Sequence, residues 1–153
     1  MTSALSLGSN LGDRQNILTS ACGKLADLPQ TRVIAVSSFY ETEPVDSPPD
    51  SPLFLNAVVL LETALAPLEL LHATQTIEQQ YFRTRSVPNA PRTLDIDILF
   101  VGGLLLETPE LTLPHPRAHL RRFVLEPLAE ILPDLVLPKQ TQTTLQLLKG
   151  FLS

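Results

Sequence analysis

The chain has 153 residues, of which 44% are hydrophobic, and this is enough for one domain that buries a core and an active site of its own. Its 16 acidic and 11 basic residues give a net charge of -5, which argues against a protein that binds nucleic acid or an anionic membrane through its overall charge. The single cysteine excludes an internal disulfide framework, and the N-terminus lacks a basic, apolar leader, so both features favour the cytoplasm. We therefore expect one soluble, monomeric domain over residues 1–153, with no nucleic-acid partner and no membrane partner.

The N-terminal segment predicts a strand, a turn and a helix. Residues 4–8 alternate briefly between apolar and polar side chains, as a strand does, and SNLGDR then breaks the pattern. Apolar residues recur at helical spacing from Ile17 to Leu28, and Asp13 stands where a helix N-cap belongs. GSNLG matches neither of the common glycine-rich phosphate motifs, so a phosphate cradle and a plain strand-to-helix turn both stay open.

Two further strands and a second helix follow. Residues 31–42 and 53–63 are rich in β-branched and aromatic side chains, and we expect these strands to pair through the proline-rich, exposed loop between them. Pro67 suits the first position of a helix whose apolar face carries Leu70 and Ile77.

The second half of the chain begins with a loop and a strongly apolar strand. Residues 83–92 contain two prolines and no apolar periodicity, so they predict a loop that leads into the strand PRTLDIDILF. A short strand within 104–111, a helix near 123–132 and an amphipathic helix over 143–152 complete the prediction. Because strands and helices mix with antiparallel neighbours, we predict an α+β fold.

Asp95 and Asp97 stand inside this apolar strand. Side chains two residues apart in a strand share a face, so the two carboxylates are neighbours, with Cα atoms roughly 6.6 Å apart. Their mutual repulsion needs a cation, a proton or bulk water to offset it. A half-exposed strand with an acidic outer face is one interpretation. The apolar flanks and the preceding Arg92 favour another, in which the pair holds Mg²⁺.

Cationic side chains gather around the aspartate pair, because six of the 11 basic residues fall between positions 83 and 122. Arg83, Arg85 and Arg92 carry planar guanidinium groups suited to phosphate oxygens, although an ordinary solvated loop stays open as an alternative. The motif LPHP holds His115 in an extended backbone near further arginines, where a structural role and a phosphate-donor role are equally open.

Six segments carry a resemblance to a known family. They are GSNLGDR near the N-terminus, SSFYETEPV at 37–45, FLNAVV at 54–59, PRTLDIDIL at 91–99, LPHP at 113–116 and RRFVLEPLAEILP at 121–133. In this order they resemble the 6-hydroxymethyl-7,8-dihydropterin pyrophosphokinases of folate biosynthesis, and PRTLDIDIL is the most specific of them. The resemblance implies a ferredoxin-like α+β sandwich with a mainly antiparallel sheet and helices on its faces. It also implies transfer of pyrophosphate from ATP to the hydroxymethyl group of the pterin, leaving AMP.

The resemblance also implies roles for individual residues. By position, Asp95 and Asp97 would bind two Mg²⁺ ions that bridge the ATP phosphates, and Arg83 and Arg92 would take part in catalysis. The residues that match the family's ATP contacts are Gln75, Glu78, Arg85, Arg92, His115 and Arg121. Those that match its pterin pocket are Thr42, Pro44, Val45, Phe54, Asn56 and Phe123.

Physical chemistry fits this pocket, because an apolar slot with one buried amide suits a flat heteroaromatic ring with several donors and acceptors. The plainer interpretation of Asn56 is a turn amide that satisfies itself. The chain departs from many family members at Pro88, Asn89 and Ala90, so how far the loop ahead of the aspartate strand closes stays open.

Two other functions would use the same carboxylates. One is another magnesium-dependent nucleotidyl- or glycosyltransferase with a different acceptor pocket, which a failure to bind pterins would favour. The other is a non-catalytic, ferredoxin-like regulatory module, which an absence of ATP consumption would favour.

Overall fold

The computed structural model describes residues 1–43, 52–81 and 94–152. In chain order, its elements are β1 (Thr2–Ser9), α1 (Arg14–Ala26), β2 (Thr31–Val36), β3 (Tyr40–Thr42), β4 (Phe54–Thr63), α2 (Pro67–Gln79), β5 (Asp95–Val101), β6 (Leu106–Glu107), β7 (Thr112–Leu113), a 3-10 helix (Ala118–Leu120), α3 (Arg122–Ile131) and α4 (Thr144–Leu152). Within these ranges, no helix combines the length and the apolar character that crossing a lipid bilayer requires.

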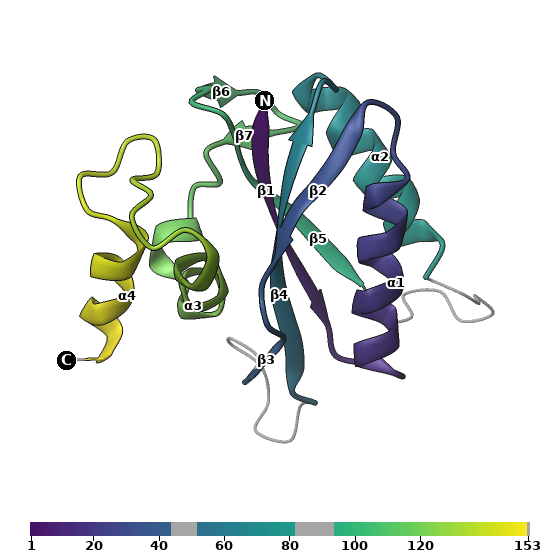
Figure 1. The fold of residues 1–153 in the computed structure, drawn as a ribbon, viewed down its shortest axis with the longest axis horizontal. Helices are drawn as coiled ribbons and strands as arrows, with labels where there is room; N and C mark the ends of the chain where they lie inside the picture. Colours follow the sequence, from purple (N-terminus) through teal and green to yellow (C-terminus); the bar gives the residue numbers. More distant parts are fainter. Residues whose placement is uncertain (44–51, 82–93, 153) are drawn as a thin grey trace.

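The main sheet has the interleaved order of a ferredoxin-like fold. Strands β2, β4, β1 and β5 lie side by side in that order, and β3 pairs with β4. Helix α1 connects β1 to β2 across β4, and α2 connects β4 to β5 across β1 (Figure 1). Every strand pairing in the described residues is antiparallel. The predicted α+β fold with a mainly antiparallel sheet is therefore confirmed.

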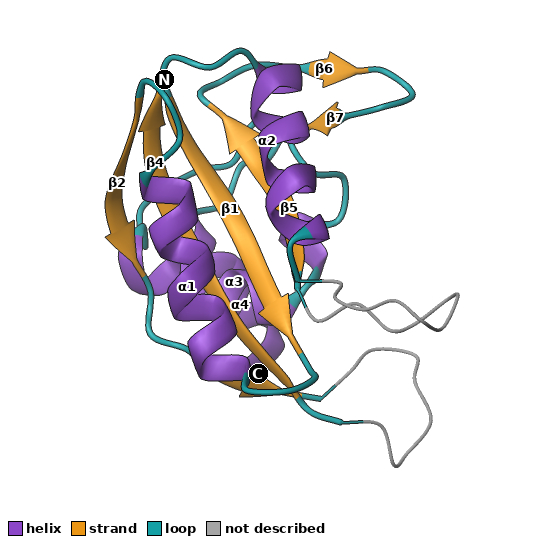
Figure 2. Ribbon diagram, turned by 90° about the vertical axis from the view of Figure 1, so that its right-hand side faces the viewer, coloured by secondary structure: helices purple, strands orange, loops and turns teal. Residues whose placement is uncertain are grey.

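Helices cover both faces of this sheet. Helices α1 and α2 lie on one face, and α3 lies on the other with α4 packed against it (Figures 1 and 2). Alternate residues of each strand serve the two layers: Leu5 and Leu7 of β1 enter the core under α1 and α2, whereas Ala4 enters the core under α3. Because both faces are covered, β1 and β4 are buried along nearly their whole length.

Local signals set the ends of the helices as predicted. The Asp13 carboxylate accepts the Asn16 N–H at 3.2 Å and caps α1. Pro67 is the first residue of α2, and the Glu69 carboxylate accepts the Ala66 N–H at 2.8 Å.

The structure corrects the strand predicted over residues 31–42. That segment forms two strands, β2 and β3, because residues 37–39 between them belong to no strand. The Ser37 hydroxyl accepts the Val58 N–H at 2.9 Å and takes a place in the β4 ladder that a backbone carbonyl would otherwise fill. The short strand expected within 104–111 is present as β6, and its partner β7 was not predicted.

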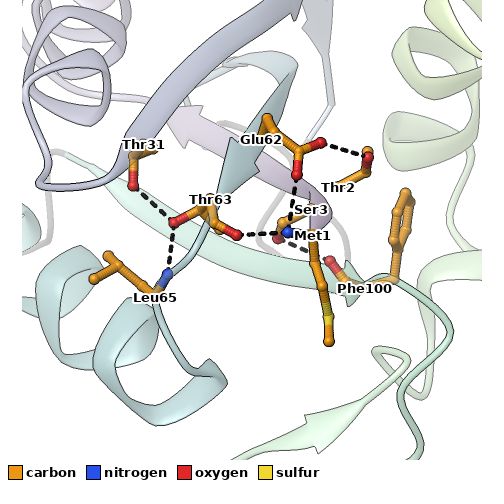
Figure 3. A network of polar contacts seen from close by, with 8 residues as sticks. All are labelled: Met1, Thr2, Ser3, Thr31, Glu62, Thr63, Leu65 and Phe100. Atoms are coloured by element: carbon orange, nitrogen blue, oxygen red, sulfur yellow. Dashed lines mark hydrogen bonds and ion pairs between the residues drawn. The ribbon is translucent and has the colours of Figure 1, made fainter.

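A polar network fastens the end of the sheet where β1 begins (Figure 3). The Met1 amino group donates to the Thr63 carbonyl at 2.6 Å and pairs with the Glu62 carboxylate at 2.9 Å. The Ser3 hydroxyl donates to the Phe100 carbonyl at 2.9 Å, so this network joins β1 to both of its neighbours. At the other end of these strands, where β1 ends, the sheet borders a cleft.

Candidate active site

The cleft has a volume of 1220 Å³ and lies at the end of β1, where β4 and β5 begin. Its walls come from the sheet, from α2 and α3, and from the last turn of α4. The lining residues are Ser6, Glu41, Thr42, Glu43, Phe54, Asn56, Leu71, Gln75, Glu78, Asp95, Ile96, Asp97, Arg117, Leu120, Arg121, Arg122, Phe123, Glu126 and Phe151. This volume exceeds the roughly 300–1,000 Å³ that is typical of small-molecule sites.

Asp95 and Asp97 lie on the face of β5 that carries α3, as the strand period predicted. They stand opposite Gly8 and Ser6 of β1, whereas Ile96 between them is only 6% exposed and packs into the core under α1 and α2. The alternation explains why two carboxylates occur in an apolar run: the apolar residues belong to one face and the acids to the other.

The carboxylate pair fits a hard divalent cation. Within the described ranges, no group of three or more His, Cys, Asp or Glu side chains is arranged to hold a metal ion. Two carboxylates supply only part of the coordination shell of such a cation, which would take its other ligands from water and from oxygens of a bound substrate. This is how Mg²⁺ is bound in many phosphoryl-transfer sites.

Glu78 on α2 holds the backbone between these two aspartates. Its carboxylate accepts the Ile96 N–H at 2.8 Å in a buried contact, and the Glu78 side chain is 9% exposed. Because β5 is an edge strand among the described strands, none of them offers a backbone carbonyl to this N–H. Gln75, three residues earlier on α2, is exposed and lines the same wall of the cleft.

One part of the cleft brings together an amide and two aromatic rings. Asn56 is 4% exposed, and its side-chain NH₂ donates to the Thr42 hydroxyl. Phe54 lies on the same face of β4, and Phe123 lies at the start of α3 across the cleft. We call these four residues the ring slot. The structure thus brings together the described residues of the predicted pterin pocket.

Gly8 is a residue that sequence reasoning did not assign to this slot. It pairs with Asn56 in the β1–β4 ladder, and a Cβ at this position would lie 2.9 Å from Asn56 Oδ1 and 3.6 Å from Phe54 Cδ1. The backbone of Gly8 lies outside the left-handed region, so the missing side chain matters for space and not for φ. The first glycine of GSNLG was the only signal of it in the sequence.

Arginines line the wall of the cleft formed by the 3-10 helix and α3. The Arg121 guanidinium lies over the Phe123 ring, 5.5 Å from its centroid, which links the predicted nucleotide contact to the ring slot. Arg117 and Arg122 line the same wall and were not predicted as site residues. Phe151 of α4 was also missed, because a tail helix gives no local signal that it reaches the cleft.

His115 is a predicted site residue that is not among the residues lining the cleft, and two hydrogen bonds with the backbone hold it in place. The backbone N–H of His115 donates to the Leu99 carbonyl at 2.8 Å, and the ring atom Nδ1 accepts the backbone N–H of Arg117 at 3.1 Å. Burial lowers the pKa of His115 below its usual 6.5; Asp97 opposes this shift, and Arg121 and Arg117 add to it. The imidazole is therefore neutral at pH 7 and carries its proton on Nε2.

Five predicted site residues lie outside the described residues, namely Pro44, Val45, Arg83, Arg85 and Arg92. Their roles stay predictions. Among the described residues, the structure brings Asp95, Asp97, Gln75, Glu78 and Arg121 to the same cleft as the ring slot.

Comparisons with known proteins agree on one family. A family model described as 7,8-dihydro-6-hydroxymethylpterin-pyrophosphokinase matches residues 4–133. Proteins named 2-amino-4-hydroxy-6-hydroxymethyldihydropteridine pyrophosphokinase are similar along most of their length. The Pseudomonas aeruginosa protein is 46% identical over 134 residues, which cover 88% of this chain and 82% of the relative. The Haemophilus influenzae protein is 41% identical over 151 residues, which cover 99% and 93% respectively.

A solved structure of Plasmodium falciparum HPPK-DHPS has the same fold. It superposes with a TM-score of 0.78 at 16% identity over 98% of this chain. The chain spans only 43% of that larger protein, so the likeness supports the fold alone.

Proposed function

The chain belongs to the 7,8-dihydro-6-hydroxymethylpterin-pyrophosphokinase family, and we propose that it transfers pyrophosphate from ATP to 6-hydroxymethyl-7,8-dihydropterin in folate biosynthesis. The pterin hydroxymethyl oxygen forms a bond to the β-phosphorus of ATP, the bond from that phosphorus to the α-phosphate oxygen breaks, AMP leaves, and the hydroxyl proton is released to solvent. One observation carries this proposal: a single cleft is lined both by the carboxylate pair of β5 and by the ring slot.

The ring slot suits the acceptor. A pterin is a flat heteroaromatic ring, which Phe54 and Phe123 would hold between them by offset stacking. The Asn56 amide, already oriented by Thr42, would hydrogen-bond the ring edge. Because Asn56 is buried, a ring that left its polar atoms unpaired would bind poorly, and this gives selectivity. Pro44 and Val45 are proposed to complete the pocket, from outside the described residues.

The carboxylate pair suits the phosphates of the donor. We assign Asp95 and Asp97 as the ligands of two Mg²⁺ ions. Bound ions of this kind neutralise charge on the transferred phosphates and orient them for in-line displacement. Glu78, through its contact with Ile96, fixes the strand that presents both carboxylates.

Cationic and polar residues beside the pair would hold the nucleotide. Arg121 and Gln75 face the cleft, and His115 would offer its Nε2–H as a neutral donor. Arg83, Arg85 and Arg92 are assigned to the ATP phosphates from the segment outside the described residues. No residue is needed as a covalent intermediate, because positioning and charge stabilisation account for catalysis of this kind.

We further propose that residues 1–153 act as one domain and as a cytoplasmic monomer, with ATP and the pterin as small-molecule partners. The continuous sheet that supports α1, α2 and α3 supports the single domain.

The test is formation of AMP from ATP, Mg²⁺ and 6-hydroxymethyl-7,8-dihydropterin. We expect AMP and the pterin diphosphate to appear in equal amounts, and EDTA to abolish both. AMP without pterin diphosphate would contradict the acceptor assignment. If no AMP forms, separate binding titrations decide the outcome: binding of ATP without the pterin favours another nucleotide-dependent transferase, and binding of neither favours a regulatory module.

A further inference from the structure

The two walls of the ring slot come from different layers of the fold. Asn56 and Thr42 belong to β4 and β3 in the sheet, whereas Phe123 belongs to α3, which rests on the sheet through Val124 and Leu128. A flat ring between these walls requires a fixed spacing, because displacements of about 1 Å can cost on the order of 10²-fold in rate. Apolar packing of α3 alone does not fix β3, which is a three-residue strand at the margin of the sheet.

A carboxylate on α3 contacts the segment that leads into β3. The two oxygens of Glu130 accept the Ser38 N–H at 3.0 and 3.1 Å, and one of them accepts the Ser38 hydroxyl at 2.9 Å. The Tyr40 hydroxyl donates to Glu130 at 2.5 Å. One side chain of α3 thus binds both the backbone and the side chains of residues 38–40. We call these contacts the Glu130 clamp.

The charge state of the clamp agrees with this geometry. Burial, together with the hydrogen bond to Glu130, raises the pKa of Tyr40 to about 12. The same hydrogen bond from Tyr40, followed by those from Ser38, lowers the pKa of Glu130. At neutral pH the carboxylate is therefore ionised and accepts from a neutral phenol in a charge-assisted hydrogen bond at an exposed site.

The clamp is connected to both walls. Glu130 lies about two turns after Phe123 on α3, so the two residues occupy the same side of the helix. Tyr40 pairs with Asn56 in the β3–β4 ladder, and Thr42, two residues later, accepts the hydrogen bond of the Asn56 amide. A shift of residues 38–40 relative to α3 would therefore displace Thr42 and change how the Asn56 amide is held opposite Phe123.

We infer that Glu130 is a positioning residue that, by tying α3 to β3, fixes the wall of the ring slot made by Thr42 and Asn56 relative to Phe123, and so controls affinity for the pterin without touching it. This inference rests on the proposed function, because it assigns the slot to the pterin. The clamp joins α3 to residues 38–40, whereas the proposed nucleotide side of the cleft is lined by Asp95 and Asp97 of β5 and by Gln75 of α2. We therefore expect loss of the clamp to change binding of the pterin more than binding of ATP.

The test compares the Michaelis constants of the two substrates in Glu130→Ala, Tyr40→Phe and the double variant. We expect Glu130→Ala to raise KM for the pterin about tenfold and to leave KM for ATP within about twofold. Tyr40→Phe keeps the ring and removes one hydrogen bond, so its effect should be smaller, and the double variant should be no worse than Glu130→Ala. Glu107→Gln is the matched control. It alters an exposed carboxylate of β6 that lies 3.6 Å from the Lys139 ammonium group.

Equal changes in both Michaelis constants, or additive effects of the two substitutions, would overturn the inference. A tyrosine titration by absorbance tests the clamp without relying on activity. The chain has two tyrosines, and the difference between the wild type and Tyr40→Phe isolates Tyr40. Its pKa, about 12 in the wild type, should fall in Glu130→Ala. An unchanged Tyr40 titration would show that the clamp does not form. If wild-type protein forms no AMP while the Tyr40 titration behaves as expected, the proposed function fails and the clamp survives.

Discussion

The two faces of the sheet are made by the same strands, yet they differ in what they bury. Under α1 and α2, the strands contribute a mainly apolar core with residues such as Leu7, Leu61 and Ile98, and the polar residues buried on this face, Ser3, Ser9 and Thr63, lie near the strand ends. On the face that carries α3, the apolar core ends partway along the strands, and Ser6, Asn56 and the aspartates take over at the open end. A strand period of two lets one segment serve stability on one side and chemistry on the other. Substitutions on the two faces should therefore separate activity from stability.

The largest expected effect is on the open face, at Asp97. Asp97→Ala should reduce the rate of AMP formation by about 10²- to 10³-fold, because it removes half of the proposed metal platform. Asp97 is exposed, so the thermal midpoint should stay close to that of the wild type. The measurement is the initial rate at saturating Mg²⁺ together with thermal unfolding, and Asp134→Ala, at another exposed aspartate, is the control. Full activity in Asp97→Ala would disprove the metal assignment.

On the face under α1 and α2, a substitution at Leu61 is expected to lower stability and to leave activity unchanged. This side chain is fully buried under α1 and α2, so Leu61→Ala should lower the free energy of unfolding by about 2–5 kcal/mol. The rate of AMP formation per folded molecule should stay near that of the wild type at low temperature. Urea unfolding and an activity assay on the same samples measure the two quantities. A large loss of activity in fully folded Leu61→Ala would contradict the separation of the faces.

An intermediate effect is expected at Gly8, which lies beside Asn56 and Phe54 of the ring slot. In Gly8→Ala the added methyl would lie 2.9 Å from Asn56 Oδ1, so the amide must move, and KM for the pterin should rise about tenfold or more. The Michaelis constant for ATP should change less. Gly103→Ala is a matched control, because a Cβ there meets no atom within 4 Å. Equal effects on both substrates would show that Gly8 acts on the whole sheet and not on the slot.

The smallest effect concerns pH and His115. Burial lowers its pKa in the folded chain, so on acidification the unfolded chain takes up this proton first. The stability that depends on neutral His115 is therefore complete above about pH 6.5 and is lost as the pH falls through the lowered folded pKa. Thermal midpoints measured between pH 7.5 and 5.5 should fall less steeply in His115→Gln than in the wild type. Parallel slopes for the two proteins would rule out a contribution of this imidazole.

Local signals predicted most of the fold. The Asp13 cap, Pro67 at the start of α2 and the alternation around Asp95 and Asp97 each depend on neighbours within a few residues, and each was confirmed. The strand predicted over 31–42 was wrong because its break depends on a partner far along the chain, Val58 of β4. The residue types within a segment indicate its strand propensity, but they do not reveal a hydrogen bond to a distant residue that interrupts the strand.

The site was predictable where a residue type itself carries the chemistry, as with the aspartate pair. It was not predictable where the role depends on packing. Gly8, Arg117 and Phe151 reach the cleft or its wall through the register of β1 and the placement of α3 and α4, which no short motif specifies. Glu78 was assigned through the family resemblance, but its contact with the Ile96 N–H depends on how α2 lies along β5.

This contact at Ile96 has a consequence for association between molecules. An edge strand offers unpaired backbone groups on which another chain can add a strand, and such addition leads to aggregation. On β5 the buried Glu78 carboxylate already occupies the N–H at the centre of the aspartate pair. At the opposite edge of the sheet, a bulge between Val33 and Ala35 disturbs the regular ladder of β2. Both margins are thus poor templates for a foreign strand, and the residue that protects β5 also holds its two aspartates in place.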